Sequence, residues 1–207
     1  MTAKDKKTVG LSQVSDRELM SYVREGNLGA FNELAERYKV RLYNFIYRVL
    51  PEREEAEDIL QETFLRAFRE RKRFDQRFCF STWIYTIALN LARSEYRRRK
   101  RWRMVRLGTS RNEGELELPD PKNHQESFMP FIEKAIETLP PEYREAFILR
   151  DINRLPYEEI AQILSVPVGT VKSRINRARL LMRQRLEPLK ENIYELSKGL
   201  PESIGIS

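Results

Sequence analysis

The chain of 207 residues is poor in the residues that build disulfides, zinc sites and membrane spans. It contains one cysteine, Cys79, and one histidine, His124. A single cysteine excludes an internal disulfide and suits a reducing compartment. A structural zinc site usually needs about four cysteine or histidine ligands, so none is expected. No run of 18 apolar residues occurs, and the first fourteen residues lack the apolar segment of a secretory signal. We therefore expect a cytoplasmic protein that does not insert into a membrane.

The sequence also lacks the signatures of common catalytic sites. It has no P-loop, no nucleophile paired with a histidine, and no cluster of metal ligands. Asp58 and Glu62 lie one helical turn apart and resemble two ligands of a metal-dependent enzyme acting on DNA, but no third ligand accompanies them. We therefore predict that the protein is not an enzyme and has no catalytic residue, no cofactor and no bound metal.

Positive charge, by contrast, is abundant and unevenly distributed. The whole chain has a net charge of +7, and the stretch 93–106 holds eight basic residues against Glu95 alone. The remainder of the chain is therefore nearly neutral. Such a stripe indicates a surface that binds phosphates. A solvated basic segment or a docking face for an acidic protein is the ordinary alternative.

The stretch 155–179 has the pattern of a helix-turn-helix. Apolar residues recur at helical spacing on both sides of Pro167, which ends one helix and begins the next. In the second helix Val171, Ile175 and Ala178 share one face, and the opposite face carries Lys172, Ser173, Asn176 and Arg177. These are side chains that read base edges in the major groove of DNA. An αα-hairpin with a merely solvated outer face is the alternative.

The other periodic segments are also helical, and no segment alternates at the period of two that strands require. We predict an all-α protein with two helical domains joined by a flexible linker. A capping box at Ser15 and Glu18 begins the first helix, Gly26 ends it, and Asn27 caps the second. The predicted divisions are a disordered tail (1–14), an N-terminal domain (15–103), a linker (104–126), a C-terminal domain (127–190) and an extension (191–207).

A third predicted helix covers about 54–73, and a fourth begins near Ser81 or Thr82 and runs into the basic stripe. Five aromatic residues lie within a dozen positions across the loop between them and the start of the fourth helix: Phe74, Phe78, Phe80, Trp83 and Tyr85. Aromatic rings beside a cationic groove suit single-stranded nucleic acid, on whose bases they stack. For any one ring, burial in the helical core is the ordinary alternative. Cys79, which aromatic residues flank, is expected to be a small buried hydrophobic residue.

Several motifs in order resemble one known family, the extracytoplasmic-function (ECF) sigma factors, which are the short two-domain sigma subunits of bacterial RNA polymerase. The resemblance covers about residues 15–190. It rests on DRELMSYVREGNLGAFNELAERY, AEDILQETFLRAF, FSTWIYTIALNLARSEYRRRKR, LPPEYREAFILRDINRLPYEEIAQIL and VPVGTVKSRINRAR. The chain is most similar in organisation to sigma-E-like members.

The resemblance implies roles for the matching residues. The N-terminal domain corresponds to region 2 and is expected to bind core RNA polymerase through Asp58, Gln61, Glu62 and Leu65. The melted −10 element of the promoter is expected to contact Phe80, Ser81, Trp83, Asn90, Arg93, Arg97 and Arg98. The C-terminal domain corresponds to region 4, and the −35 element is expected to contact Gly169, Thr170, Lys172, Ser173, Asn176 and Arg177.

The resemblance also implies partners. These are the clamp helices of the β′ subunit and the flap of the β subunit of core RNA polymerase, promoter DNA, and an anti-sigma factor. One local departure is Pro156, which stands where a capping serine or threonine is common. The nearest alternative is a stand-alone helix-turn-helix regulator that binds duplex DNA as a dimer. It would not account for an acidic helix followed by an aromatic loop and a basic helix.

Overall fold

The computed structural model describes residues 10–107 and 129–187, which are helical and contain no β-strand, as the sequence predicts. The predictions for residues 1–9, for 108–126 of the linker and for the C-terminal extension lie outside these ranges. The α-helices are α1 (Asp16–Arg24), α2 (Leu28–Val49), α3 (Arg53–Arg69), α4 (Phe80–Leu107), α5 (Met129–Glu137), α6 (Pro141–Phe147), α7 (Tyr157–Leu164) and α8 (Val168–Leu186). A π-helix, η4 (Ile148–Ile152), continues α6.

The first two helices begin and end at the residues that the sequence indicates. The Ser15 side chain accepts a hydrogen bond from the Glu18 amide, while the Glu18 carboxylate accepts one from the Ser15 amide, which completes the capping box. Asn27 caps α2 by accepting from the Ala30 amide at 3.0 Å. Between the two helices Gly26 has φ +93°, a left-handed conformation that favours glycine.

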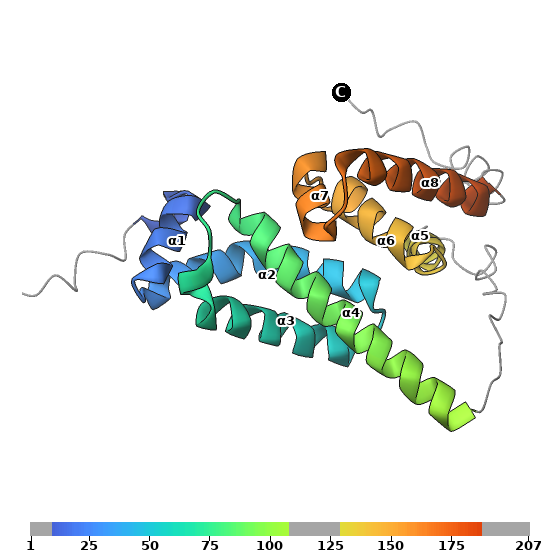
Figure 1. The fold of residues 1–207 in the computed structure, drawn as a ribbon, viewed down its shortest axis with the longest axis horizontal. Coiled ribbons are helices and arrows are strands. Elements are labelled where there is room, and N and C mark those ends of the chain that lie inside the picture. Colours follow the sequence, from blue (N-terminus) through green and yellow to red (C-terminus); the bar gives the residue numbers. More distant parts are fainter. Residues whose placement is uncertain (1–9, 108–128, 188–207) are drawn as a thin grey trace, which may run out of the picture.

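Helices α1 to α4 form the N-terminal domain, whose core lies among their apolar faces (Figure 1). On α2 the apolar residues that recur at helical spacing in the sequence are buried at Leu34, Leu42, Ile46 and Val49, while Phe31 and Tyr38 are partly buried against the core. On α3 the buried residues include Ala56, Ile59, Thr63 and Ala67, again as the helical spacing predicts.

Helices α5 to α8 form the C-terminal domain, in which α7 and α8 make the predicted helix-turn-helix. Ser165 ends α7 in the left-handed conformation (φ 55°), and the Val166 amide donates to the Ala161 carbonyl at 3.0 Å. This arrangement satisfies carbonyls at the end of α7 and turns the chain within the three residues between α7 and α8. Pro167 then stands at the start of α8. Neither Pro156 nor Pro167 makes a side-chain cap, which fits the departure noted at Pro156.

The two domains pack against each other rather than standing apart. Helix α4 contacts α7, and α2 contacts α5 and α6, so the C-terminal helices lie along one side of the N-terminal bundle (Figure 1). This packing joins the apolar residues of both domains into one core cluster. No helix among the described residues is both long and apolar enough to span a bilayer.

Some helix boundaries differ from the sequence-based expectation. The helical pattern of the sequence predicts one helix over about 54–73. In the structure, α3 ends at Arg69 and a 3₁₀ turn follows at Arg71–Arg73. Helix α4 begins at Phe80 and continues to Leu107, three residues beyond the predicted start of the linker. The predicted disordered tail contains a 3₁₀ turn at Leu11–Gln13. Arg37 donates hydrogen bonds to the carbonyls of Leu11, Ser12 and Val14, and thereby holds this segment on α2.

Candidate nucleic-acid interface

The outer face of α8 presents the side chains that the sequence predicts for DNA contact. Val171, Ile175 and Ala178 are fully buried, which fixes the rotation of the helix. The opposite face is therefore turned to solvent, and its four predicted base-reading residues are exposed: Lys172, Ser173, Asn176 and Arg177. At the start of the helix Gly169 is exposed and faces open space, and Thr170 is half-buried.

Contacts behind the exposed face hold α8 in place. Arg179 makes a bidentate ion pair with Asp151 of η4, at 3.0 Å from Nε and 2.5 Å from Nη2. The Arg150 guanidinium lies over the Tyr157 ring at 4.6 Å, and the Lys172 ammonium lies 5.7 Å from the same ring. Of the two predicted basic residues on the face, Lys172 therefore lies near an aromatic ring at its edge, and Arg177 has no ion pair within the described residues.

The start of α4 carries an aromatic cluster, but not all of its rings are available to a ligand. Phe80 is only 3% exposed and packs edge-on against Tyr38, with Phe74 and Trp83 also in contact. Trp83 is half-buried, and its ring lies 5.1 Å from that of Phe74. In this arrangement the buried Phe80 ring packs against Trp83 and has no free face on which a nucleic-acid base could stack.

The polar residues predicted to contact the −10 element are spread along α4. Asn90, Arg97 and Arg98 are exposed, and Arg98 makes an ion pair with Glu95 at 2.8 Å. Arg93 is half-buried and turned toward the C-terminal domain. The structure therefore places these residues on one long helix without gathering all of them into a single pocket.

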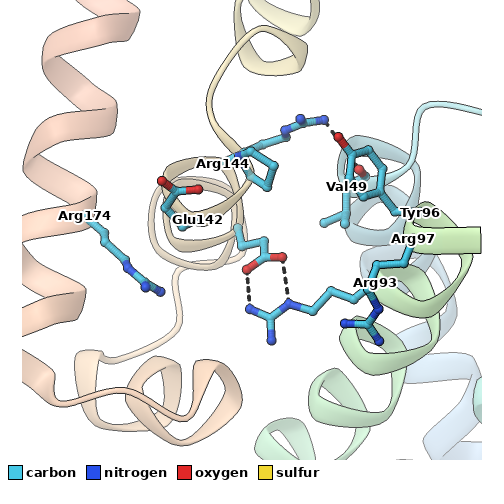
Figure 2. A pocket seen from close by; sticks show the side chains of 9 residues that line it. Val49, Arg93, Tyr96, Arg97, Glu142, Arg144 and Arg174 are labelled. Atoms are coloured by element: carbon cyan, nitrogen blue, oxygen red, sulfur yellow. Dashed lines mark hydrogen bonds and ion pairs between the residues drawn. The ribbon is translucent and has the colours of Figure 1, made fainter. Parts of the chain in front are cut away.

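Two glutamates of the C-terminal domain bind residues of α4 directly. Glu159 of α7 accepts hydrogen bonds from Ser81 at 2.6 Å and from Thr82 at 3.1 Å. Glu145 of α6, whose side chain is 6% exposed, makes a bidentate ion pair with Arg93 at 2.9 Å and 2.5 Å (Figure 2). Two residues predicted to contact the −10 element are thus engaged within the protein itself.

Two further contacts join the domains. Arg48 of α2 makes a bidentate ion pair with Glu133 of α5, and the Asn153 amide donates to the Tyr85 hydroxyl at 2.8 Å. Burial raises the pKa of Tyr85 well above its usual range, so its hydroxyl stays protonated. None of these pairs was predicted, because residues 52 to 85 positions apart in the chain leave no periodic signal in a single sequence.

The predicted polymerase-binding residues share the outer face of α3. Asp58, Gln61 and Leu65 are exposed, and Glu62 is half-exposed with an ion pair to Arg69 at 3.6 Å. Leu65 is 51% exposed. A single exposed leucine is common on protein surfaces, so its exposure leaves it available for a contact without itself indicating one.

Cys79 lies just before α4 and is exposed, so the expectation that it is buried was wrong. Partial desolvation, together with the charge and hydrogen bond of Glu159, raises the pKa of its thiol. Within the described residues, no group of three or more Cys, His, Asp or Glu side chains is placed to hold a metal ion.

Two family models match the chain in the order in which the domains occur. Residues 34–102 match region 2 of the sigma-70 family, and residues 132–182 match region 4. Among curated proteins, the chain is 35% identical over 182 residues to the ECF RNA polymerase sigma factor SigW of Bacillus subtilis. This alignment covers 84% of the chain and 97% of SigW. The chain is also 35% identical over 186 residues to the ECF RNA polymerase sigma-E factor of Escherichia coli K12, covering 86% and 97%.

Two solved structures are similar over most of their length. The chain matches CnrH, solved in complex with the cytosolic domain of CnrY, with a TM-score of 0.63 and 25% identity, covering 84% of this chain and 97% of that one. It also matches the sigma factor RpoE of Bartonella quintana, solved with the anti-sigma factor NepR, with a TM-score of 0.62 and 25% identity. This match covers 75% of the chain and 97% of RpoE.

Proposed function

Since this chain belongs to the ECF sigma factors of RNA polymerase, we propose that it directs core polymerase to a class of promoters by reading two promoter elements. One is the −35 duplex and the other is the melted −10 strand. The chemistry of RNA synthesis belongs to the polymerase, and the chain supplies recognition. The observation that carries this proposal is the outer face of α8, where four polar side chains lie opposite a fully buried apolar stripe.

The −35 duplex is read by α8 in the major groove. Lys172 and Arg177 suit the O6 and N7 acceptors of guanine, Asn176 suits adenine, and Ser173 accommodates either. Gly169 and Thr170 lie at the N-terminus of a helix of nineteen residues, where amides point outward and the helix dipole favours a phosphate. Since Gly169 faces open space, the DNA backbone can approach the helix closely there.

The melted −10 strand is read along α4. A base must leave the stack before its edge is accessible, and unstacking costs a few kcal/mol that a pocket with rings and amides offsets. Trp83 and Asn90 supply a ring and an amide, while Arg97 and Arg98 supply positive charge for the backbone. Phe80 contributes by supporting Trp83. Because Glu159 binds Ser81 and Glu145 binds Arg93, Ser81 and Arg93 reach DNA only after the two domains separate.

Core polymerase binds the outer face of α3, where Asp58, Gln61, Glu62 and Leu65 are presented together. This binding fixes the N-terminal domain, while the flap of the β subunit receives the C-terminal domain. Holding the two domains apart on the polymerase frees Ser81 and Arg93 for the promoter. We further propose that an anti-sigma factor regulates the chain, because a similar sigma factor was solved with one.

The test is run-off transcription with purified core polymerase and promoters selected from a randomised DNA library. We expect specific initiation only when this protein is present. We also expect Asn90→Ala to reduce permanganate reactivity of the −10 region while binding of the −35 duplex by the holoenzyme is retained. Tight, specific binding of duplex DNA by a dimer without polymerase would instead support the stand-alone regulator.

A further inference from the structure

The start of α4 is held on the N-terminal domain through Phe80, the first residue of the helix. Its buried ring packs edge-on against the Tyr38 ring of α2, with the ring centroids 5.1 Å apart. The same ring also contacts Trp83, with 6.2 Å between the centroids, and Phe74 contacts both. Phe80 therefore links Tyr38 to Trp83, the ring proposed for the −10 strand.

The Tyr38 ring is itself fixed by a hydrogen bond at its far end. Its hydroxyl donates to Asp16 Oδ2 of α1 at 2.5 Å, and the other oxygen of this carboxylate accepts from Arg37 at 2.7 Å. Arg37 is held in turn by Glu33 at 2.9 Å. Burial, followed by the hydrogen bond to Asp16, raises the pKa of Tyr38 well above its usual range, so the hydroxyl keeps its proton. Because the acceptor is charged, this hydrogen bond is stronger than one between neutral groups.

The start of α4 has a second support, which comes from the other domain. Glu159 of α7 accepts a hydrogen bond from Ser81 at 2.6 Å. The proposed function requires the two domains to separate, and this support is then lost. The contacts of Tyr38 with Asp16 and with Phe80 lie wholly within the N-terminal domain, so they persist after separation. They are therefore in place when the melted strand binds.

On the basis of the proposed function, in which a base of the −10 strand stacks on Trp83, we propose that Tyr38 and Asp16 are positioning residues for Trp83. Edge-to-face ring contacts prefer a defined geometry, so the orientation of Tyr38 determines that of Phe80, and Phe80 supports the Trp83 ring. A ring that is fixed before binding loses less conformational freedom when a base stacks on it. The two residues thus raise the affinity for the melted strand without contacting it.

The test uses the full chain with small changes at the two residues. Tyr38→Phe keeps the ring and removes the hydroxyl, and Asp16→Ala removes the acceptor. Asp16→Asn keeps an acceptor for the hydroxyl, so this variant should behave more like the parent than Asp16→Ala does. Tyr47→Phe, at an exposed tyrosine on the same helix, is the matched control. All variants are compared below the temperature at which any of them unfolds.

The first measurement reports on Trp83 in the isolated protein. The chain has two tryptophans, so Trp102→Phe, at an exposed position, leaves Trp83 as the only one. In this background we expect Tyr38→Phe and Asp16→Ala to increase quenching of Trp83 by acrylamide and to shift its emission to longer wavelength. Tyr47→Phe should leave both unchanged. A lower melting temperature without any change in Trp83 would overturn the proposal, because it would show a purely structural role.

The second measurement compares the promoter elements with the holoenzyme. The probes are a single-stranded oligonucleotide with the −10 sequence of a promoter selected by run-off transcription, and the −35 duplex of the same promoter. Since one hydrogen bond to a charged group is equivalent to about tenfold in an equilibrium constant, Tyr38→Phe and Asp16→Ala should each weaken binding of the −10 strand by up to about tenfold. Binding of the −35 duplex and of core polymerase should be unchanged.

Equal weakening of all three kinds of binding would overturn the proposal by showing a general defect of the fold, and unchanged binding of the −10 strand would overturn it too. Trp83→Ala separates this result from a failure of the proposed function. If Trp83→Ala binds the −10 strand as the parent does, Trp83 does not read the strand, and the proposed function is wrong at this residue. If Trp83→Ala loses binding while Tyr38→Phe retains it, only the positioning role is wrong.

Discussion

The burial of Val171, Ile175 and Ala178 fixes the rotation of α8. In the proposed contact with the −35 element, each side chain on the exposed face would therefore meet a fixed position of the groove. Ser173 has an internal partner as well, since its hydroxyl donates to the Thr170 carbonyl at 2.9 Å. Lys172, Asn176 and Arg177 are thus the residues whose polar ends are best placed for DNA.

Replacing either basic residue of this face should relax specificity at one or two positions of the −35 element. We expect Lys172→Ala or Arg177→Ala to cost about 1–3 kcal/mol for the promoter with the matching base, because a contact to a base edge is lost. The measurement is holoenzyme affinity across a set of −35 point mutants. Arg183→Ala, an exposed arginine further along α8, is the control. Unchanged discrimination in both test variants would refute the assignment.

Cys79 offers a chemical probe of its neighbour Glu159. Desolvation and then the negative charge of Glu159 raise the pKa of the thiol, so the reactive thiolate is scarce near neutral pH. In Glu159→Gln the charge is removed, and the pKa should fall toward its ordinary value. Alkylation by iodoacetamide, measured across pH, should therefore reach half its maximal rate at a lower pH in this variant. Glu158→Gln, an exposed neighbour on α7, should leave the profile unchanged.

Among whole elements, α3 illustrates how one helix serves two surfaces. Its inner face buries Ala56, Ile59 and Ala67, while its outer face presents the predicted polymerase contacts. Charge reversal of the outer face, Asp58→Lys with Glu62→Lys, should weaken holoenzyme assembly by at least tenfold without lowering thermal stability, because exposed charges contribute little to folding. Glu25→Lys, exposed at the end of α1, is the control. The measurement is binding to labelled core polymerase.

Two results would contradict this prediction. Normal assembly by the charge-reversed protein would place the polymerase contact elsewhere. A large fall in melting temperature would show that the α3 face supports the fold instead, and the assembly defect would then be secondary.

At the scale of elements, the sequence predicts most of the fold because the relevant signals are local. Capping side chains three residues from their partners, as at Ser15 and Asn27, mark where helices start. Apolar spacing marks which face of α2, α3 or α8 is buried. The helix-turn-helix follows from the same two signals together with Pro167. The start of α4 is less predictable. Its first residue is Phe80, whose ring packs against Tyr38 of α2, and a contact between distant residues leaves no local signal in the sequence.

The predicted −10 contacts illustrate what a sequence cannot indicate. The residue types at Ser81 and Arg93 suit DNA, but the structure shows that each also has a partner in the C-terminal domain. Such pairing depends on how two domains dock, and neither Glu145 nor Glu159 differs in sequence pattern from an ordinary surface glutamate. The burial of Phe80 is likewise a tertiary property, since an aromatic residue beside a basic helix is compatible with either a core or a binding site.

For the whole molecule, the packing of the two domains has a consequence for how promoter binding is controlled. Charged hydrogen bonds join the two domains along one interface. They pair Arg48 with Glu133, Arg93 with Glu145, and Ser81 with Glu159. A ligand binds with reduced apparent affinity when only a small fraction of the protein is in the competent conformation. The isolated protein should therefore bind promoter DNA weakly, and polymerase should increase the competent fraction by holding the domains apart.

Loosening this interface should reveal the DNA-binding capacity of α4 without polymerase. In the double variant Glu145→Gln with Glu159→Gln, charged hydrogen bonds to Arg93 and Ser81 are weakened, and each contributes about 1.5–3 kcal/mol. We expect the double variant to bind a single-stranded −10 oligonucleotide about tenfold more tightly than the parent, since a larger fraction of the protein is open. Affinity is measured by fluorescence anisotropy at fixed salt, because charge alone affects DNA binding. The double variant Glu25→Gln with Glu158→Gln removes the same number of charges from exposed positions and is the matched control. Equal gains in both double variants would attribute the effect to net charge, and the interface would then have no part in restraining promoter binding.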